Sequence, residues 1–193
     1  ADALDDVQIA VIPGYTSAPA AVFNGQEYAV VWINIHDLTI RAARISRDGA
    51  VVERNRLIAS VPYNPYSTYR IAIAWNGNRY LVGWTSGHTL HCALLDEELR
   101  PLSDRTIATS TFPANPTVTT NGTEFLLVWR ESDGRKYGIA YWMIDGAGTP
   151  RDTGAKRHAA NSNLDQHAVA FDGEQFTIVW RDDSEHTFHL MRL

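Results

Sequence analysis

One nine-residue pattern occurs four times along this chain and limits its fold more than any other feature. Each copy starts with Asn-Gly or Asp-Gly, has an aromatic residue four positions later and a Trp eight positions later. The copies span residues 24–32, 76–84, 121–129 and 172–180. Their first residues lie 52, 45 and 51 positions apart. Self-similarity at such an interval indicates a repeat architecture.

Each copy predicts a β-hairpin. An Asn-Gly or Asp-Gly pair can adopt the positive φ values of a type I′ turn, whose twist matches that of the joined strands. Small, β-branched and aromatic residues of strand length flank the pair, for example residues 20–23 and 28–32 around the first turn. The chain is therefore expected to contain four such hairpins.

A third and a fourth strand follow most hairpins. Third strands are predicted at 38–45, 88–95, 137–144 and 186–193, and the first three end in turns at 48–49, 96–97 and 145–146. More polar fourth strands are predicted at 51–59, 101–109 and 149–159. A four-stranded meander in each repeat is typical of a propeller blade.

The fourth copy lacks an outer strand, because the sequence stops at Leu193 after the third one. Residues 6–12 provide a spare strand before the first hairpin, and the wrap-around interval is again 45. We therefore predict an all-β, four-bladed β-propeller with four-stranded antiparallel blades, closed by its own two ends. It forms a single domain, 1–193, with repeats at about 13–60, 61–110, 111–160 and 161–193 plus 6–12.

The repeat resembles those of secreted or surface bacterial β-propeller proteins. Pro19–Trp32 and Ala43–Gly49 carry the resemblance most completely, and the other three copies carry it with gaps. It implies a fold and an extracellular or cell-surface location, but no shared activity. Four blades are also similar to the hemopexin-like domain, although that family's Asp-Ala-Ala and Phe-x-x-Asp motifs and its terminal Cys residues are absent.

Composition excludes some partners. A formal net charge of -5 with interspersed signs gives no basic stripe for phosphates, so nucleic acid is not an expected partner. No run of about 18 apolar residues predicts a membrane span. The single Cys92 lies in a strand-like run, where a small buried thiol is expected.

Aromatic and histidine residues are the most conspicuous candidates for chemistry. The four repeat Trp residues are expected in the core between blades, whereas Trp75 and Trp142 break the pattern and are open to a functional role. Two His pairs, 88/91 and 186/189, have a spacing that places their side chains on opposite faces of a strand. Neither pair is therefore predicted to chelate a metal.

No catalytic residue or cofactor is predicted. Neither a nucleophile with its base nor a glycosidase-like carboxylate pair stands out in the sequence. Asp182, Asp183 and Glu185 offer calcium-type ligands, but their spacing matches no defined calcium loop, and solvated charge is the preferred interpretation. A structural ion in the central channel stays open.

A ligand site is predicted at one end of the inner strands. Ala18, Arg70, Asn115 and Gln166 each stand six residues before a turn residue, so three polar side chains would border one mouth of the channel. The preceding segment 61–69 contains Tyr63, Tyr66 and Tyr69 and has the composition of a recognition loop. The alternatives are a solvated rim and tyrosines that pack over the blade ends.

These features favour a non-enzymatic binding or interaction module, with a glycan, an anion or a protein as its ligand. One alternative is a glycan-acting hydrolase whose catalytic residues lie on loops, and another is a structural spacer. The sequence does not predict an oligomeric state.

Overall fold

The computed structural model describes residues 7–12, 14–62, 69–108, 112–132, 134–152, 155–159 and 164–193, and the regular elements among them are all β-strands. Within these residues no helix is long and apolar enough to cross a membrane. The strands form four antiparallel sheets, in chain order along the sequence. The first three sheets have four strands each and the last has three.

The first sheet contains β1 (Ala20–Phe23), β2 (Glu27–Asn34), β3 (Thr39–Ser46) and β4 (Val51–Ser60). The second contains β5 (Ile71–Trp75), β6 (Tyr80–Ser86), β7 (Thr89–Leu95) and β8 (Pro101–Ala108). The third contains β9 (Ala114–Thr120), β10 (Glu124–Ser132), β11 (Tyr137–Asp145) and β12 (Lys156–Ala159). The fourth contains β13 (Leu164–Phe171), β14 (Phe176–Asp182) and β15 (Thr187–Arg192).

The four predicted hairpins are confirmed, but their turn differs from the expected one. The backbone N–H of Asn24 donates a hydrogen bond to the Glu27 carbonyl, so Gly25 and Gln26 are the two central residues of the turn. Of these two, only Gly25 has a positive φ, 102°. Glycine at that position is typical of a type II′ turn, not type I′. The Asn24 Oδ1 atom accepts hydrogen bonds from the N–H groups of Gln26 and Glu27, at 2.8 and 2.7 Å. The same capping recurs at Asn76, Asn121 and Asp172, which explains why Asn or Asp precedes the glycine.

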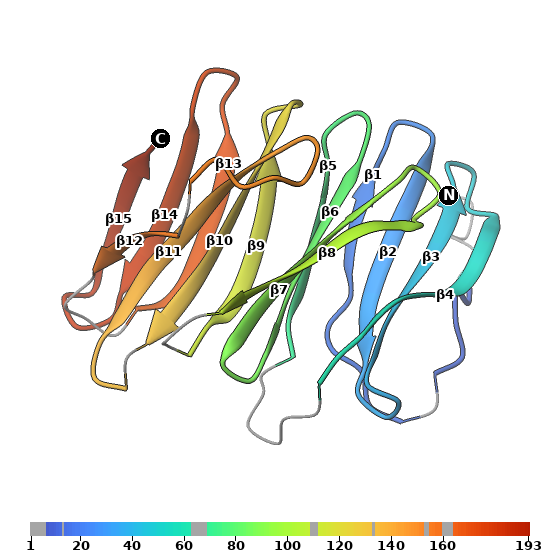
Figure 1. Cartoon of the computed structure of the whole chain (residues 1–193), viewed down its shortest axis with the longest axis horizontal. Coiled ribbons are helices and arrows are strands. Elements are labelled where there is room, and N and C mark those ends of the chain that lie inside the picture. Colours follow the sequence, from blue (N-terminus) through green and yellow to red (C-terminus); the bar gives the residue numbers. More distant parts are fainter. Residues whose placement is uncertain are drawn as a thin grey trace, which may run out of the picture.

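The sheets lie side by side in a row, with the first and the last at opposite ends (Figure 1). We call the face that bears the repeat Trp the front face of a sheet, and the opposite face its back face. The back face of each sheet packs on the front face of the next. At the first interface, for example, Val31 and Ile33 share a core with Val82 and Trp84. The other two interfaces are built in the same way, around Leu127 and Trp129 and around Ile178 and Trp180.

The predicted composite blade is wrong. Ile9, Ala10 and Ile12 pack on the front face of the first sheet, against Val30, Trp32 and Ala43, and do not pair with β15. Among the described residues no other sheet covers this apolar face, and the N-terminal segment lies on it instead. The described residues therefore form an open row with a three-stranded last sheet, and no closed ring. The doubtful fourth strand at 149–159 is also shorter than expected, since β12 covers only 156–159 and Pro150 contributes an isolated bridge.

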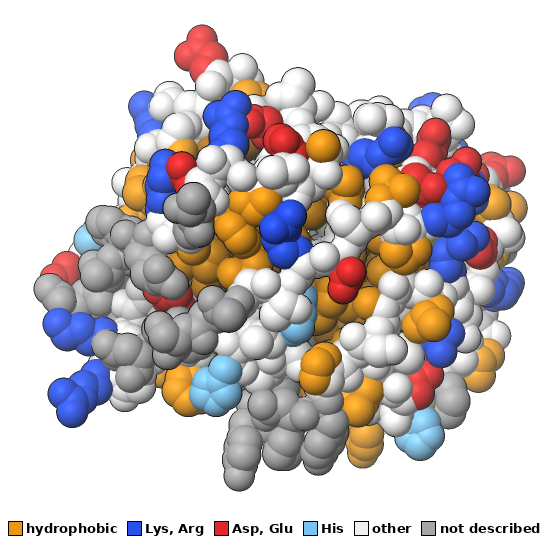
Figure 2. All heavy atoms as spheres, in the orientation of Figure 1, with side chains coloured by type: hydrophobic (Ala, Val, Ile, Leu, Met, Phe, Trp, Pro, Cys, Tyr) orange, Lys and Arg blue, Asp and Glu red, His pale blue; other side chains and the backbone are white. Residues whose placement is uncertain are grey.

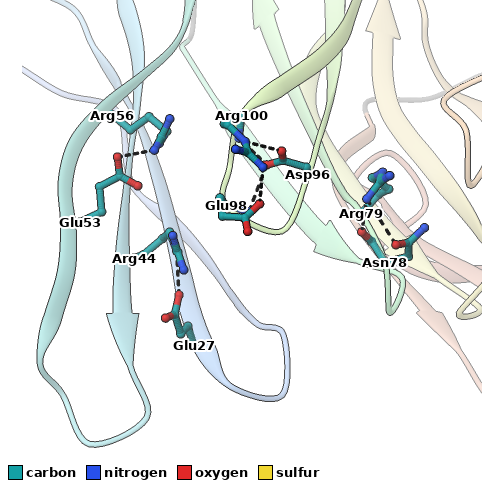
Figure 3. A network of polar contacts seen from close by, with 9 residues as sticks. All are labelled: Glu27, Arg44, Glu53, Arg56, Asn78, Arg79, Asp96, Glu98 and Arg100. Carbon is teal, nitrogen blue, oxygen red and sulfur yellow. Dashed lines mark hydrogen bonds and ion pairs between the residues drawn. The ribbon is translucent and has the colours of Figure 1, made fainter.

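Charged side chains on the surface of the row form ion pairs. Glu27 pairs with Arg44 at 2.7 Å, and Arg100 bridges Asp96 and Glu98 at 2.6 and 2.8 Å (Figure 3). In Figure 2, charged groups border the upper part of the view, and hydrophobic side chains are visible in its hollowed middle. Ion pairs at a protein surface contribute at most about 1 kcal/mol each. They fit a solvated surface better than a reactive centre.

Candidate functional site

A cleft of about 500 Å³ lies between the outer strands of the first and second sheets. Its polar lining consists of two serines, one threonine, one histidine and one carboxylate, namely Ser60, His91, Ser103, Asp104 and Thr106. Apolar and proline residues complete the wall, namely Ile58, Ala59, Pro62, Trp84, Ala93, Pro101 and Leu102. Polar and apolar groups share the wall about equally. A concave site where a few polar groups converge beside apolar ones is a usual form of a small-ligand site.

His91 is the fixed part of this wall. Its Nδ1 lies 3.1 Å from the Thr106 hydroxyl and its Nε2 lies 2.7 Å from the Thr89 hydroxyl. The ring stacks on Trp84, with centroids 5.3 Å apart and planes 8° apart. Burial lowers the pKa of His91, with Asp104 opposing that effect, so the ring is neutral near pH 7. A neutral imidazole has one donor and one acceptor, and the two hydroxyls can satisfy both.

Strand register explains how the sequence builds this wall. Trp84 on β6 stands directly opposite His91 on β7, and His91 stands opposite Thr106 on β8. Directly opposite residues of an antiparallel pair share one face of the sheet and lie in contact. Three successive strands therefore place an indole, an imidazole and a hydroxyl side by side.

The electrostatics of the cleft are mildly acidic. Asp104 is the one carboxylate among the described residues that line it, and no Lys or Arg is among them. The remaining polar groups are hydroxyls and a neutral histidine. Such a lining suits a ligand with many hydroxyl groups and does not suit an anion.

The predicted recognition loop starts at this cleft. Pro62 lines the cleft, and its carbonyl accepts a hydrogen bond from the Ser86 hydroxyl at 2.8 Å. The N–H of Val61 donates to the Leu38 carbonyl at 2.7 Å, which fixes the end of β4. Tyr63 and Tyr66 lie outside the described residues. Tyr69 is half-buried and packs against the core of the first two sheets, as the packing alternative expects for this tyrosine.

The structure places the three predicted polar side chains at the same end of consecutive inner strands. Arg70 is exposed just before β5, Asn115 lies near the start of β9, and Gln166 is exposed near the start of β13. Among the described residues no hydrogen bond joins these three side chains. Because the row is open, they line one edge of it and do not form a ring; Gln166 borders a separate hollow of about 150 Å³.

Two of these residues occupy β-bulges. Between Thr117 and Ala114 the strand β9 has two residues, Asn115 and Pro116, opposite the single residue Trp129. Asn115 takes a φ of 51° there. Strand β13 has an equivalent bulge that contains Gln166. Bulges re-aim side chains and are frequent beside functional sites, and a proline inside a strand pattern was the available sequence signal for the first one.

His167 is a residue that sequence reasoning missed. It follows the bulge in β13, and its Nε2 lies 3.2 Å from the Thr117 hydroxyl of the neighbouring inner strand. Burial and, to a smaller extent, the nearby Arg130 lower the pKa of His167 to about 4, although a hydrogen bond with the Val128 backbone opposes them. The side chain is therefore neutral above this pH and links the third and fourth sheets.

In the acidic loop after β14, the three residues that offer calcium-type ligands, Asp182, Asp183 and Glu185, do not act as one group. Asp182 Oδ1 accepts hydrogen bonds from the N–H groups of Ser184 and Glu185, at 2.9 and 3.2 Å, while Asp183 pairs with Arg181 at 2.8 Å. His189, not Asp183, brings its ligand atom within 4.8 Å of Asp182 and Glu185. Turn capping accounts for the buried position of Asp182.

The predictions for tryptophan and cysteine are confirmed where the structure describes them. The four repeat Trp residues are 0–5% exposed and lie in the core. Trp75 packs on Tyr80 with ring centroids 4.4 Å apart, and Trp142 donates its indole N–H to the Asp152 carbonyl at 3.2 Å. Both contacts are structural. Burial raises the pKa of Cys92 to about 11, so its thiol stays protonated and unreactive.

Comparison with known proteins supports the fold. No protein-family model matches the sequence, and no curated protein is similar to it. The structure is similar to that of a GH43 α-L-arabinofuranosidase from Clostridium thermocellum, with a TM-score of 0.53 and 13% identity over 91% of this chain and 67% of that one. It is similar to a GH43 β-1,3-galactosidase with a TM-score of 0.56 and 8% identity, over 91% and 75% of the two chains.

A third similar structure is a subtype N10 neuraminidase-like protein from a little yellow-shouldered bat isolate from Guatemala. The TM-score is 0.56 and the identity 6%, over 89% of this chain and 57% of that one. Identities this low carry information on fold and none on activity. The likenesses establish an all-β, propeller-like arrangement of antiparallel sheets, in structures that are longer than this chain.

Proposed function

We propose that this protein is a non-enzymatic glycan-binding module whose ligand occupies the cleft between the first and second sheets. The observation that carries the proposal is the lining of this cleft: hydroxyl groups, one carboxylate and a rigid histidine on an apolar wall. Hydroxyls and a carboxylate hydrogen-bond sugar hydroxyls, and the apolar wall packs against the C–H face of a sugar ring. Because His91 is held by two threonines and by Trp84, the wall is pre-organised.

A neutral glycan fits this lining better than an anion. An anionic ligand would be desolvated next to Asp104 without a Lys or Arg among the described lining residues. A neutral saccharide can instead donate hydroxyl hydrogens to the Asp104 carboxylate, and hydrogen bonds to a charged group contribute about 1.5–3 kcal/mol each.

The number of carboxyl groups also supports binding without hydrolysis. Glycoside hydrolysis usually requires a pair of carboxyl groups roughly 5–9.5 Å apart. The described cleft lining has one carboxyl group, that of Asp104. The inner strands of the four sheets, β1, β5, β9 and β13, also have one carboxyl group in their sequences, that of Asp165. A lone carboxylate can bind and orient a sugar, but it cannot serve as acid and as base or nucleophile together.

The proposal also includes further ligand contacts outside the cleft and a location for the protein. Tyr63 and Tyr66 would extend the site from Pro62 along the predicted recognition loop, and Arg70, Asn115 and Gln166 would contact longer ligands at the loop end of the inner strands. The resemblance of the repeats to secreted bacterial propeller proteins supports an extracellular or cell-surface location.

Calorimetric titration with neutral saccharides tests the proposal. We would titrate the protein with arabinose, xylose and galactose oligomers, and with glucuronic acid as an anionic comparison. Asp104→Asn should weaken neutral-sugar binding about tenfold or more. Asp152→Asn, which removes a surface carboxylate paired with Lys156, is the matched control and should leave binding unchanged. Binding that persists in Asp104→Asn but is lost in Tyr66→Ala and Arg70→Ala would move the site to the loop end.

A second candidate function is glycan hydrolysis, favoured by the likeness to GH43 glycosidase structures. In that case residues of the loops would supply the second carboxyl group. Turnover of aryl arabinosides, xylosides or galactosides that is lost in Asp104→Asn would support this alternative and contradict the binding-only proposal.

A further inference from the structure

Both ends of the row carry uncovered apolar surface. On the back face of the fourth sheet Val179 stands opposite Ala168 and Leu190, and Arg181 stands opposite Phe188, so these side chains share one face. Phe188 is 77% and Leu190 56% exposed. In the first two sheets the positions equivalent to Leu190 are Ala42 and Cys92, which are only 0% and 4% exposed because the next sheet covers them.

The front face of the first sheet is incompletely covered. Phe23 and Tyr28 pack against each other with ring centroids 4.7 Å apart and are 37% and 42% exposed. The residues equivalent to Tyr28 in the later sheets are Tyr80, Phe125 and Phe176, which are 0–4% exposed. The difference is that each later sheet is covered by the back face of a preceding sheet.

These two surfaces are the two halves of an interface that the chain already builds three times. At each internal interface a back face packs on a front face, with apolar residues at the same repeat positions. A front face and a back face are therefore left without a partner sheet at opposite ends of the row (Figure 1). We propose that the back face of the fourth sheet binds the front face of the first sheet of a second copy of this chain.

The hollow on the back face supports such an occupant. It measures about 150 Å³ and is bordered by Ala168, Val179 and Phe188, with Gln166 and Arg181 at its polar side. At the second internal interface, the Leu127 side chain of a front face occupies the space beside Gly83 on the back face. An apolar side chain of the partner's first sheet can fill the hollow in the same way.

The N-terminal segment is the competing cover. Ile9, Ala10 and Ile12 lie on the first sheet's front face, but residues 7–12 form no strand in the described chain. In the proposed contact, the back face of the incoming sheet takes the place of this unpaired segment. Because the two surfaces differ, the contact is heterologous, and copies join head to tail, as a closed ring or an open chain.

Sedimentation equilibrium on the whole chain and on two single variants tests the proposal. Tyr28→Asp blocks the front face, and Leu190→Asp blocks the back face. Both positions are exposed, so each variant should keep a near-native melting temperature. We expect the wild type to associate with increasing concentration, and each variant to weaken association at least about tenfold. Leu102→Asp, at a 50% exposed site on β8 away from both end faces, should associate like the wild type.

Mixing the two variants gives the decisive result. Tyr28→Asp retains an intact back face and Leu190→Asp an intact front face, so the equimolar mixture should form a one-to-one dimer that neither variant forms alone. A wild type that stays monomeric at about 100 µM would overturn the proposal. A Tyr28→Asp variant that still dimerises by itself would overturn it as well, because it would show a back-to-back contact.

Discussion

The second and fourth sheets carry the same three side chains in the same arrangement. The members are Trp84, Thr89 and His91 in the second sheet and Trp180, Thr187 and His189 in the fourth. The indole and imidazole rings stack at 5.3 and 5.4 Å with planes 8° and 13° apart. The Thr hydroxyl lies 2.7 and 2.9 Å from the His Nε2 atom. Local sequence and strand register are sufficient to build this arrangement.

Their surroundings are different. In the second sheet β8 adds Thr106 as a second partner of His91, and this residue is 9% exposed at the wall of the cleft. In the described part of the chain the fourth sheet has three strands, and the side chain of His189 is 39% exposed, with Glu185 at 3.9 Å. The same local structure is therefore a buried wall in the middle of the row and an open surface at its end. Neighbouring strands and sheets decide whether the arrangement is buried or exposed.

The largest expected difference between the middle and the end concerns the repeat tryptophans. Trp129→Ala should cost about 3–5 kcal/mol in the free energy of unfolding, because the residue is fully buried between the second and third sheets. Trp32→Ala should cost clearly less, since only the N-terminal segment covers it. Urea denaturation of both variants measures the two losses. Equal losses would mean that the N-terminal segment buries Trp32 as effectively as a whole sheet buries Trp129.

The pH dependence of stability should show the burial of His167 between the third and fourth sheets. Its pKa is about 4 in the folded state against 6.5 for the ordinary group, so the unfolded chain binds a proton that the folded chain does not. Stability should fall by about 3 kcal/mol as the pH drops from roughly 6.5 to roughly 4, and not further through this group.

Denaturation curves of the wild type and of His167→Gln at several pH values check this expectation. The variant should lose the part of the acid dependence that belongs to His167, while the remainder, to which His91 contributes in the same direction, stays. A variant with the full wild-type loss between pH 6.5 and 4 would refute the assignment.

Gly83 allows a third comparison. It stands in β6 where the other repeats have Val31, Val128 and Val179, and a Cβ atom there would lie 2.8 Å from Leu127 Cδ1. Gly83→Val should therefore cost about 2 kcal/mol by overpacking the interface of the second and third sheets. The double variant Gly83→Val/Leu127→Ala should lose less stability than the sum of the losses of the two single variants. Val179→Gly on the exposed end face serves as the reverse change, with a smaller expected loss.

The smallest expected effect concerns the hydroxyl partners of His91 in the second sheet and His189 in the fourth. Thr106→Val removes a partner of the buried His91 and should cost about 1 kcal/mol. Thr187→Val removes the partner of His189, which water can replace, and should cost less than about 0.5 kcal/mol. Thermal melts of both variants measure the difference. A larger loss for Thr187→Val would contradict the view that the end of the row is solvated.

Much of the fold could be predicted because its determinants are local. Turn residues, alternating apolar residues and the position of the repeat Trp fixed the hairpins and nearly all strand boundaries within one or two residues. The turn type was mistaken, because the Asn or Asp side chain caps the turn from outside its central pair, which a dipeptide pattern does not show. The candidate cleft was missed, since its lining comes from β4, β6, β7 and β8, and no short pattern links Ser60 with Asp104.

The sequence by itself determined the four hairpins, the stacked Trp–His pairs and the apolar faces, because these depend on neighbours along the chain or directly across a strand pair. Only the tertiary structure decided that residues 7–12 lie on the first sheet and not beside β15. Equal repeat spacing shows that a ring could close, but the position of a short apolar segment depends on which uncovered surface it buries best. That choice is a competition between distant surfaces, and it leaves Phe188 and Leu190 at the end of the row exposed.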